Sequence, residues 1–444
     1  MIGKQVKKLL GDFKLTSRIN PETFNGISKY YKNIKAEYNR MIKLGESAKI
    51  HSKHNPVKSG QDTEHPRREA LLKSSSPTRL ELLQLSDTEL DTWFNENISR
   101  NQDLSLGLLG DDKFSYFFPS EIHTEIHQTY NTLDTYEIKY SRRDKKTITI
   151  SFSIEYCKGK ALKVGEITQM QLRTLLLGAL SPTPKKYSVV IYPSKIKKDF
   201  KNTSSKKRLG ASNVNSGVTT IYKDNDIVNK TTVFRREELG KLLIHELIHN
   251  LEYDFGFSAT LDTTIDLHNV FNVPRGSNIL LNETYTETVA LLINAILCNL
   301  EKSNKGGIKT IVKSIYLELI FNLFQTAKIL DFYGFQNAEE LNQPDDTLGR
   351  FNQSSNVLSY YYLKTAVLYN FKDFITFVDK YTTNFYIHDS DSPNTQKAFV
   401  SLILKSTRNP DFLNDVNRMM DFFKKNKRGL PREIENTLRM TCIE

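Results

Sequence analysis

The spacing of apolar residues predicts helices in the N-terminal part of the chain. Between residues 20 and 43, apolar side chains recur at helical spacing and place Ile34 and Tyr38 on one face. A stretch rich in Ser, Lys, His and Pro follows at 45–77 and indicates a linker. Another helix is expected between residues 77 and 95.

From about residue 123 the pattern changes to the alternation that is typical of strands. Alternating apolar residues at 136–140 and 148–156 flank a polar turn and predict a hairpin. One further helix and three further strands are expected, at 168–180 for the helix and at 187–192, 218–222 and 231–234 for the strands. After Arg236 the pattern is mostly helical. The fold class is therefore α+β, with a small mixed sheet followed by helices.

Charge is distributed unevenly over the 444 residues. The formal net charge is +11, yet residues 1–80 contain 17 Lys and Arg against 7 Asp and Glu, whereas the rest of the chain contains 45 against 44. We interpret residues 1–80 as a basic N-terminal arm with a flexible linker. Such an arm can contact nucleic acid or an acidic surface. The alternative is a solvated tail or a pro-segment, because the basic residues of 1–80 are not clustered with aromatic side chains on which bases could stack.

No segment predicts a membrane span or a secretory leader. The longest apolar run, 289–297, is far shorter than the roughly 18 residues that a bilayer requires, and only two leucines follow the lysines near the N-terminus. We therefore expect a soluble cytoplasmic protein with no transmembrane segment. The three cysteines, Cys157, Cys298 and Cys442, imply no disulfide framework. A metal site would have to use His and carboxylate ligands.

The segment KLLIHELIHN at 241–250 contains the motif HExxH. Residues four apart lie on one helical face, so His245 and His249 can bind the same ion. Glu246, next to the first histidine, can accept a proton from a zinc-activated water. Leucines around the motif supply the buried stripe of a core helix. The motif therefore predicts a catalytic zinc site on a helix.

A third ligand is expected from the next predicted helix. The segment NETYTETVA at 282–290 places Glu283 and Glu287 four residues apart on one face. Catalytic zinc usually has three protein ligands, so we assign Glu283 to the metal and Glu287 to the other ring nitrogen of a ligand histidine. The alternative is a pair of exposed acids at a helix N-terminus, where the helix dipole favours them.

The combination of HExxH with NExxxE resembles the gluzincin branch of the zincin metallopeptidases, over about residues 217–297. HELIH is also the form of the motif in clostridial neurotoxin light chains. The 33 residues between His249 and Glu283 are closer to the spacing of those toxins than to that of thermolysin-like enzymes. More loosely, LLIHELIHNLEYD, NETYTETVA and NVLSYYYLK are similar to predicted zinc metallopeptidases of giant DNA viruses. The resemblance implies a zincin-like fold, and a viral origin would add the virion as a location.

These patterns together predict a zinc-dependent metallopeptidase that binds one Zn2+ per chain and hydrolyses a peptide or protein substrate, with Glu246 as general base. The zincin-like catalytic region is expected at 81–300, and a helical C-terminal subdomain at 301–444. The alternative function is a non-catalytic zincin-fold structural or binding protein, packaged in a virion, with a basic arm that binds nucleic acid.

Two further features of such a site remain open. The segment 216–222 is either an edge strand that pairs with an extended substrate or an ordinary hairpin strand. The expected hydrolysis also needs a hydrogen-bond donor for the substrate carbonyl oxygen, on which negative charge develops during the reaction. The candidate donors are Tyr360, Tyr361, Tyr362, Arg350, His268 and His388.

Overall fold

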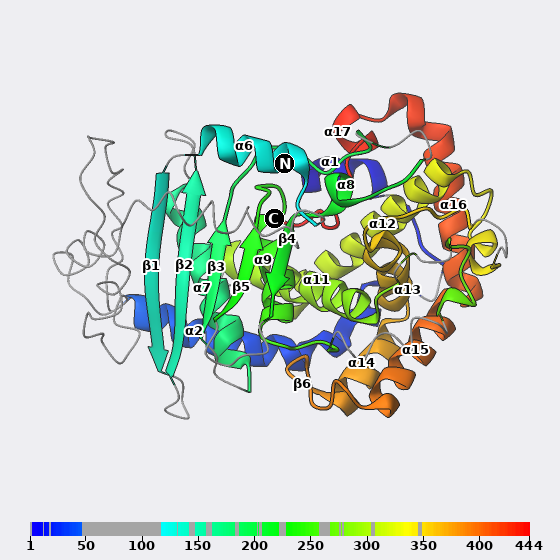
Figure 1. Cartoon of the computed structure of the whole chain (residues 1–444). Helices are drawn as coiled ribbons and strands as arrows, with labels where there is room; N and C mark the ends of the chain where they lie inside the picture. The colour runs from blue at the N-terminus through cyan, green and yellow to red at the C-terminus, as the bar shows by residue number, and fades with distance from the viewer. Residues whose placement is uncertain are drawn as a thin grey trace.

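A five-stranded sheet lies at one side of the molecule and most helices lie at the other, as Figure 1 shows for this computed structural model. The expectation of helices with a small mixed sheet is confirmed. The structure describes residues 2–46 and 117–444 apart from short gaps at 12, 17–18, 131, 142–146, 157–161, 183–185, 202, 204–206, 222–227, 257–266, 275–276, 278, 303–306 and 345–348.

The sheet is mixed because two antiparallel pairs flank a parallel centre. Its order is β1-β2-β3-β5-β4, with β1/β2 and β5/β4 antiparallel and the two central pairs parallel. The predicted hairpin is β1/β2, in which Ile138 lies opposite Ile150. Among the described strands, β4 has a neighbour on one side only. The strands are β1 (Thr132–Ser141), β2 (Thr147–Tyr156), β3 (Tyr187–Ile191), β4 (Gly217–Thr220) and β5 (Asn229–Val233).

Alternation along β3 places apolar residues, and therefore helices, on both faces of the sheet. Val189 belongs to the main hydrophobic core, whereas Val190 belongs to a smaller cluster on the opposite face. Helix α6 (Ser120–Thr129) packs on the smaller cluster. Helices α7 (Val164–Leu180) and α9 (Leu239–Asn250) pack together on the main-core face, where α9 also contacts β4 and β5.

The expectation of strands from residue 123 is wrong at its start, because α6 occupies residues 120–129. Ile122 and Ile126 lie one helical turn apart and are both buried, so a period of four describes this segment better than alternation. His123 therefore lies on a helix. The helix that was expected at 77–95 falls outside the described residues.

The N-terminal helices correct the expectation of a basic arm over residues 1–80. Elements α1 (Ile2–Leu10), η1 (Pro21–Ile27) and α2 (Ser28–Glu46) bury their apolar faces in the main core, with α1 against α12 and α2 against α7. The lysines of α1 stay on its exposed face. Residues 2–46 are thus part of the folded body, and the linker that was expected after them lies outside the described residues.

The chain after α9 is mainly helical, as expected. Helices α11 (Leu281–Lys302) and α12 (Ile308–Tyr333) pack against each other, and α11 also packs against α9 (Figure 1). The remaining elements are α8 (Ala211–Val214), η5 (Glu339–Asn342), η6 (Ser359–Leu363), α13 (Lys364–Tyr369), α14 (Phe371–Tyr381), β6 (Thr382–Thr383), β7 (Tyr386–Ile387), α15 (Pro393–Thr407), α16 (Pro410–Asn426), η7 (Lys427–Gly429) and α17 (Arg432–Glu435). None of the described helices combines the length and apolar character needed to cross a bilayer.

One hydrophobic core joins the predicted catalytic region to the predicted C-terminal subdomain, since it extends from the N-terminal helices to Cys442. The last residues return to the centre of the molecule. The backbone N–H groups of Met440 and Thr441 each donate to the carboxylate of Glu238 at 2.6 Å, just before α9. The C-terminal segment therefore packs against the helix that carries HExxH.

Candidate metal centre

Helix α9 supplies both histidines from one face. It begins after Glu238, which has a left-handed backbone (φ 60°), and ends at Asn250. Every residue from Lys241 to Asn250 is buried, which explains why this helix is rich in leucine and isoleucine. The four-residue spacing places the rings of His245 and His249 with their centroids 4.8 Å apart.

Helix α11 brings the predicted third ligand to these histidines. Oε2 of Glu283 lies 3.3 Å from Nε2 of His245 and 3.4 Å from Nε2 of His249. The two Nε2 atoms are 3.2 Å apart. All three side chains are buried, and together they can hold a metal ion. Within the part of the chain that the structure describes, the group has no fourth His, Cys, Asp or Glu.

Glu283 is oriented by its neighbours toward the two imidazoles. Its Oε1 accepts a hydrogen bond from Nδ2 of Asn356 at 3.1 Å, whereas no described residue donates a hydrogen bond to Oε2. Burial alone would raise the pKa of Glu283, but the adjacent imidazoles of His249 and His245 hold it at about 2. The carboxylate is therefore ionised at neutral pH, as a metal ligand must be.

Glu287 contacts the first histidine, as the sequence predicted. Its Oε1 lies 2.8 Å from Nδ1 of His245, whereas Nε2 of the same ring lies near Glu283. Two buried lysines also bind this carboxylate: Nζ of Lys241 contacts Oε1, and Nζ of Lys364 lies 3.2 Å from Oε2. Burial alone would raise the pKa of Glu287, but Lys241 and Lys364 hold it well below its usual range.

The second histidine has its own carboxylate partner, Asp254, which the sequence analysis missed. Oδ2 of Asp254 lies 2.6 Å from Nδ1 of His249 and accepts a hydrogen bond from Thr286 at 2.9 Å. Helical spacing gave no signal for this contact, because a residue five positions on does not share the face of His249. The left-handed turn at Glu252 (φ 55°) reverses the chain after α9 and returns Asp254 to the histidine.

Glu246 lies against strand β4. Oγ1 of Thr219 donates a hydrogen bond to Oε2 of Glu246 at 2.9 Å. A Cβ atom at Gly217 would lie 2.5 Å from Oε1, so only a glycine allows the backbone of β4 to approach the carboxylate this closely. Burial raises the pKa of Glu246, although His245 and His249 oppose this effect. A raised pKa suits a carboxylate that accepts a proton near neutral pH.

Of the three consecutive tyrosines, Tyr360 faces the centre. Its ring packs edge-on against His245, with 6.1 Å between the ring centroids. Burial, followed by the charge of Glu283, raises the pKa of Tyr360 well above its usual value, so its hydroxyl keeps its proton and can donate. The residues 359–363 form a π-helical segment, a distortion that is frequent at functional sites.

The next two tyrosines have structural partners away from the centre. The hydroxyl of Tyr361 donates to the backbone carbonyl of Leu438, and that of Tyr362 donates to Oδ1 of Asn342 at 3.1 Å. One turn of helix aims consecutive side chains in different directions, so a single tyrosine of the three can reach the metal ligands.

The other candidate donors are engaged elsewhere. Arg350 forms an ion pair with Glu340 at 2.6 Å, and Nε2 of His388 lies 3.0 Å from Oγ1 of Thr383. Burial lowers the pKa of His268, which contacts the backbone of a nearby loop. These three side chains make no described contact with the metal-ligand group.

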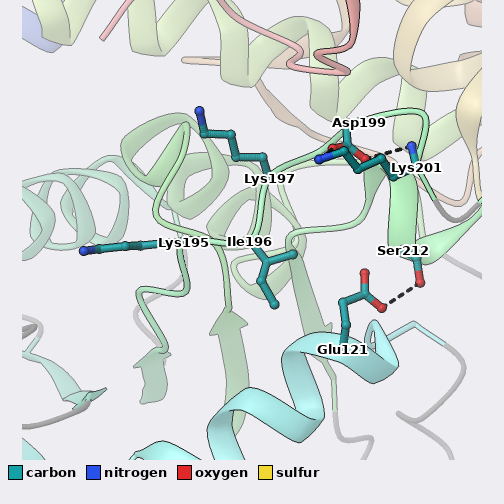
Figure 2. A pocket seen from close by; sticks show the side chains of 7 residues that line it. All are labelled: Glu121, Lys195, Ile196, Lys197, Asp199, Lys201 and Ser212. Atoms are coloured by element: carbon teal, nitrogen blue, oxygen red, sulfur yellow. Dashed lines mark hydrogen bonds and ion pairs between the residues drawn. The ribbon is translucent and has the colours of Figure 1, made fainter. Parts of the chain in front are cut away.

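A surface hollow of about 360 Å³ contains none of the predicted site residues. Figure 2 shows that its lysines do not converge: Lys195 and Lys197 point in different directions, and Lys201 pairs with Asp199 at 3.6 Å. The lining residues are Glu121, Lys195, Ile196, Lys197, Asp199, Lys201 and Ser212. The hollow therefore does not compete with the His-His-Glu group as a candidate site.

Comparisons of the chain with protein-family models, with curated proteins and with solved structures find no match.

Proposed function

We propose that this chain is a zinc-dependent metallopeptidase with a zincin-like fold, in which His245, His249 and Glu283 hold one zinc ion and Glu246 is the general base. One observation carries the proposal: a buried three-ligand group lies beside a separate buried carboxylate. Zinc sites that only stabilise a fold use four protein ligands and have no use for such a carboxylate.

The spacing of the ligand atoms suits zinc. A tetrahedral zinc ion with ligand distances of about 2.0–2.1 Å keeps its ligand atoms about 3.3 Å apart, and the separations in this chain are 3.2, 3.3 and 3.4 Å. Imidazole and carboxylate are also ligand types that zinc accepts. No described side chain supplies a fourth ligand, which leaves a position for a reactant.

The charges around the group favour a divalent cation. With neutral histidines, four carboxylates and two ammonium groups leave an excess of two negative charges in a buried region. Such an excess is costly unless it is compensated. In the metal-free chain, Asp254, Glu283 and Glu287 raise the pKa of His249 and His245 against the effect of burial, so protonated imidazoles compensate it, and one divalent ion would replace those two protons. The charged groups are those of Glu246, Asp254, Glu283, Glu287, Lys241 and Lys364.

The proposed reaction divides roles among the residues around the ion. When bound, zinc would supply Lewis-acid chemistry, since it polarises a carbonyl and lowers the pKa of water. Glu246 accepts the proton of the attacking water and delivers it to the departing amine. The hydroxyl of Tyr360 donates a hydrogen bond to the carbonyl oxygen as negative charge develops on it.

Strand β4 supports a peptide as the substrate. It is an edge strand of the described sheet, and its Thr219 holds the carboxylate of Glu246. An extended peptide that pairs with the open side of β4 would lie along the same strand that positions the base. Backbone pairing of this kind is tolerant of side chains, so a peptide is a more natural substrate than a small molecule.

The test is a screen of a peptide library with zinc-loaded protein, followed by comparison with Glu246→Gln. We expect Glu246→Gln to retain zinc while hydrolysis falls by at least about 100-fold. The control is Glu433→Gln, which changes an exposed glutamate on α17 and should cleave as the wild type does. Equal cleavage by wild type and Glu246→Gln contradicts the mechanism. A zinc-loaded wild type that cleaves nothing in the library favours the non-catalytic alternative.

A further inference from the structure

Three nitrogen groups converge on one buried carboxylate, that of Glu287. Nδ1 of His245 lies 2.8 Å from Oε1, and Nζ of Lys241 contacts the same oxygen. Nζ of Lys364 lies 3.2 Å from Oε2. Glu287 and Lys241 are each 1% exposed and Lys364 is 0% exposed. The cluster therefore connects α9, α11 and α13 directly behind a metal ligand.

The register of the two metal-binding helices produces this cluster. Lys241 lies one helical turn before His245 on α9, and Glu287 lies one turn after Glu283 on α11. Because α9 and α11 pack side by side, Lys241 meets Glu287 one turn away from the ligand atoms. Lys364, the first residue of α13, reaches the other carboxylate oxygen.

A structural ion pair does not account for both lysines. One buried ammonium compensates one buried carboxylate, whereas a second ammonium adds a desolvation cost and shares the same attraction. The other contacts of the two lysines are weak: Lys364 donates to the carbonyl of Met440 at 3.3 Å, and Lys241 lies 3.8 Å from the sulfur of Met440. The charge of Glu318 also acts on Lys364, but Glu287 is the carboxylate that contacts both ammonium groups directly.

We propose that Lys241 and Lys364 are positioning residues of the metal centre, which hold the Oε1 atom of Glu287 beside Nδ1 of His245, at 2.8 Å. This inference rests on the proposed function. One lysine on each oxygen prevents the carboxylate from rotating. A carboxylate only accepts hydrogen bonds, so Nδ1 carries the proton and Nε2 keeps the lone pair that a metal ligand needs.

The experiment compares Lys364→Met with Lys328→Met in the full chain. Lys328 is a matched control, because it is also buried, and its Nζ donates to the backbone carbonyls of Ile434 and Thr437 at 2.9 and 2.6 Å. Both variants should unfold at lower urea concentration than the wild type. In competition with a chelator, Lys364→Met should bind Zn2+ about tenfold more weakly or worse, whereas Lys328→Met should bind Zn2+ as the wild type does.

A double-mutant cycle distinguishes an effect of Lys364 on zinc affinity through Glu287 from a general loss of stability. If Lys364 acts through Glu287, then Lys364→Met should have little further effect on zinc affinity in a Glu287→Gln background. Imidazole ¹⁵N shifts should also show that His245 loses its single tautomer in Lys364→Met. If Lys364→Met does not fold, Lys241→Met removes the donor to the other carboxylate oxygen and serves the same comparison.

The outcomes distinguish this inference from the function on which it rests. Unchanged zinc affinity in folded Lys364 and Lys241 variants, or additive effects in the cycle, overturns the positioning role. A wild-type chain that binds no Zn2+ instead contradicts the metal centre itself.

Discussion

Oδ2 of Asp254 forms a hydrogen bond with Nδ1 of His249 at 2.6 Å, and Oε1 of Glu287 lies 2.8 Å from Nδ1 of His245. Each candidate ligand histidine therefore has its own carboxylate partner. One partner comes from the turn that follows α9, and the other comes from α11. Partners of this kind select the ring tautomer and the ring orientation, so they influence metal affinity without touching the metal.

Asp254→Asn is therefore expected to weaken zinc binding by about 10–100-fold while the protein stays folded. An amide oxygen accepts more weakly than a carboxylate, so Nδ1 of His249 is held less firmly. Zinc affinity is measured by competition with a chelator. The control is Asp379→Asn, which changes a surface aspartate that forms an ion pair with Lys29 at 2.8 Å. Equal affinity in both variants would show that Asp254 only shapes the turn.

Glu283→Gln should weaken zinc binding more than Glu287→Gln does, because the loss of a ligand outweighs the loss of its orienting partner. Wild-type protein should hold about one zinc ion per chain, and His249→Ala should hold almost none. Metal analysis together with zinc titration checks these expectations. The reverse order of the two glutamate variants would mean that their roles are exchanged.

Tyr360→Phe should lower kcat by about 10²–10³-fold with little change in KM or zinc content, because its hydroxyl is needed when negative charge develops. Tyr362→Phe is the matched control, since that hydroxyl bonds Asn342 instead. Steady-state kinetics on a peptide from the library screen provides the measurement. Wild-type kcat in Tyr360→Phe would remove this residue from the mechanism.

Glu318 on α12 links stability to pH. Burial raises its pKa from 4.5 to about 7, although the backbone N–H groups of Cys442 and Ile443 donate to it at 3.1 and 3.0 Å. Between these two pKa values the folded chain binds more protons than the unfolded chain. The contribution of Glu318 to stability is therefore greatest below its unfolded pKa, and it falls by about 3 kcal/mol as the pH rises to its folded pKa.

Glu318→Gln should consequently flatten the pH dependence of stability over this window. Urea unfolding near pH 5 and near pH 8 compares the variant with wild type and with Glu433→Gln, which changes an exposed glutamate on α17. The same fall in stability in all three proteins would exclude Glu318 as its source.

Local sequence patterns were sufficient to find the central part of the candidate site. HExxH places His245 and His249 on one face through helical geometry alone, and the buried run around it predicts a core helix. The spacing of Glu283 and Glu287 follows the same rule on α11. The β1/β2 hairpin was also readable, because alternation and a polar turn are properties of neighbouring residues.

Other features depend on contacts between residues that are distant in the chain, and only the tertiary structure decided them. The choice of Tyr360 over Tyr361 follows from how the segment 359–363 packs on α11, and spacing cannot reveal this. The docking of residues 2–46 depends on apolar surfaces of α7 and α12 that their own sequence does not contain.

The residues that contact the candidate ligands show most clearly what the sequence determines and what the tertiary structure determines. Asp254 reaches His249 because one left-handed residue reverses the chain, and Lys364 reaches Glu287 across 77 positions. Periodicity determines which residues share a face of one helix, and so the sequence by itself determined the candidate metal ligands and the candidate base. The packing of separate helices determines which faces meet, and so only the folded chain decided what holds those ligands in place.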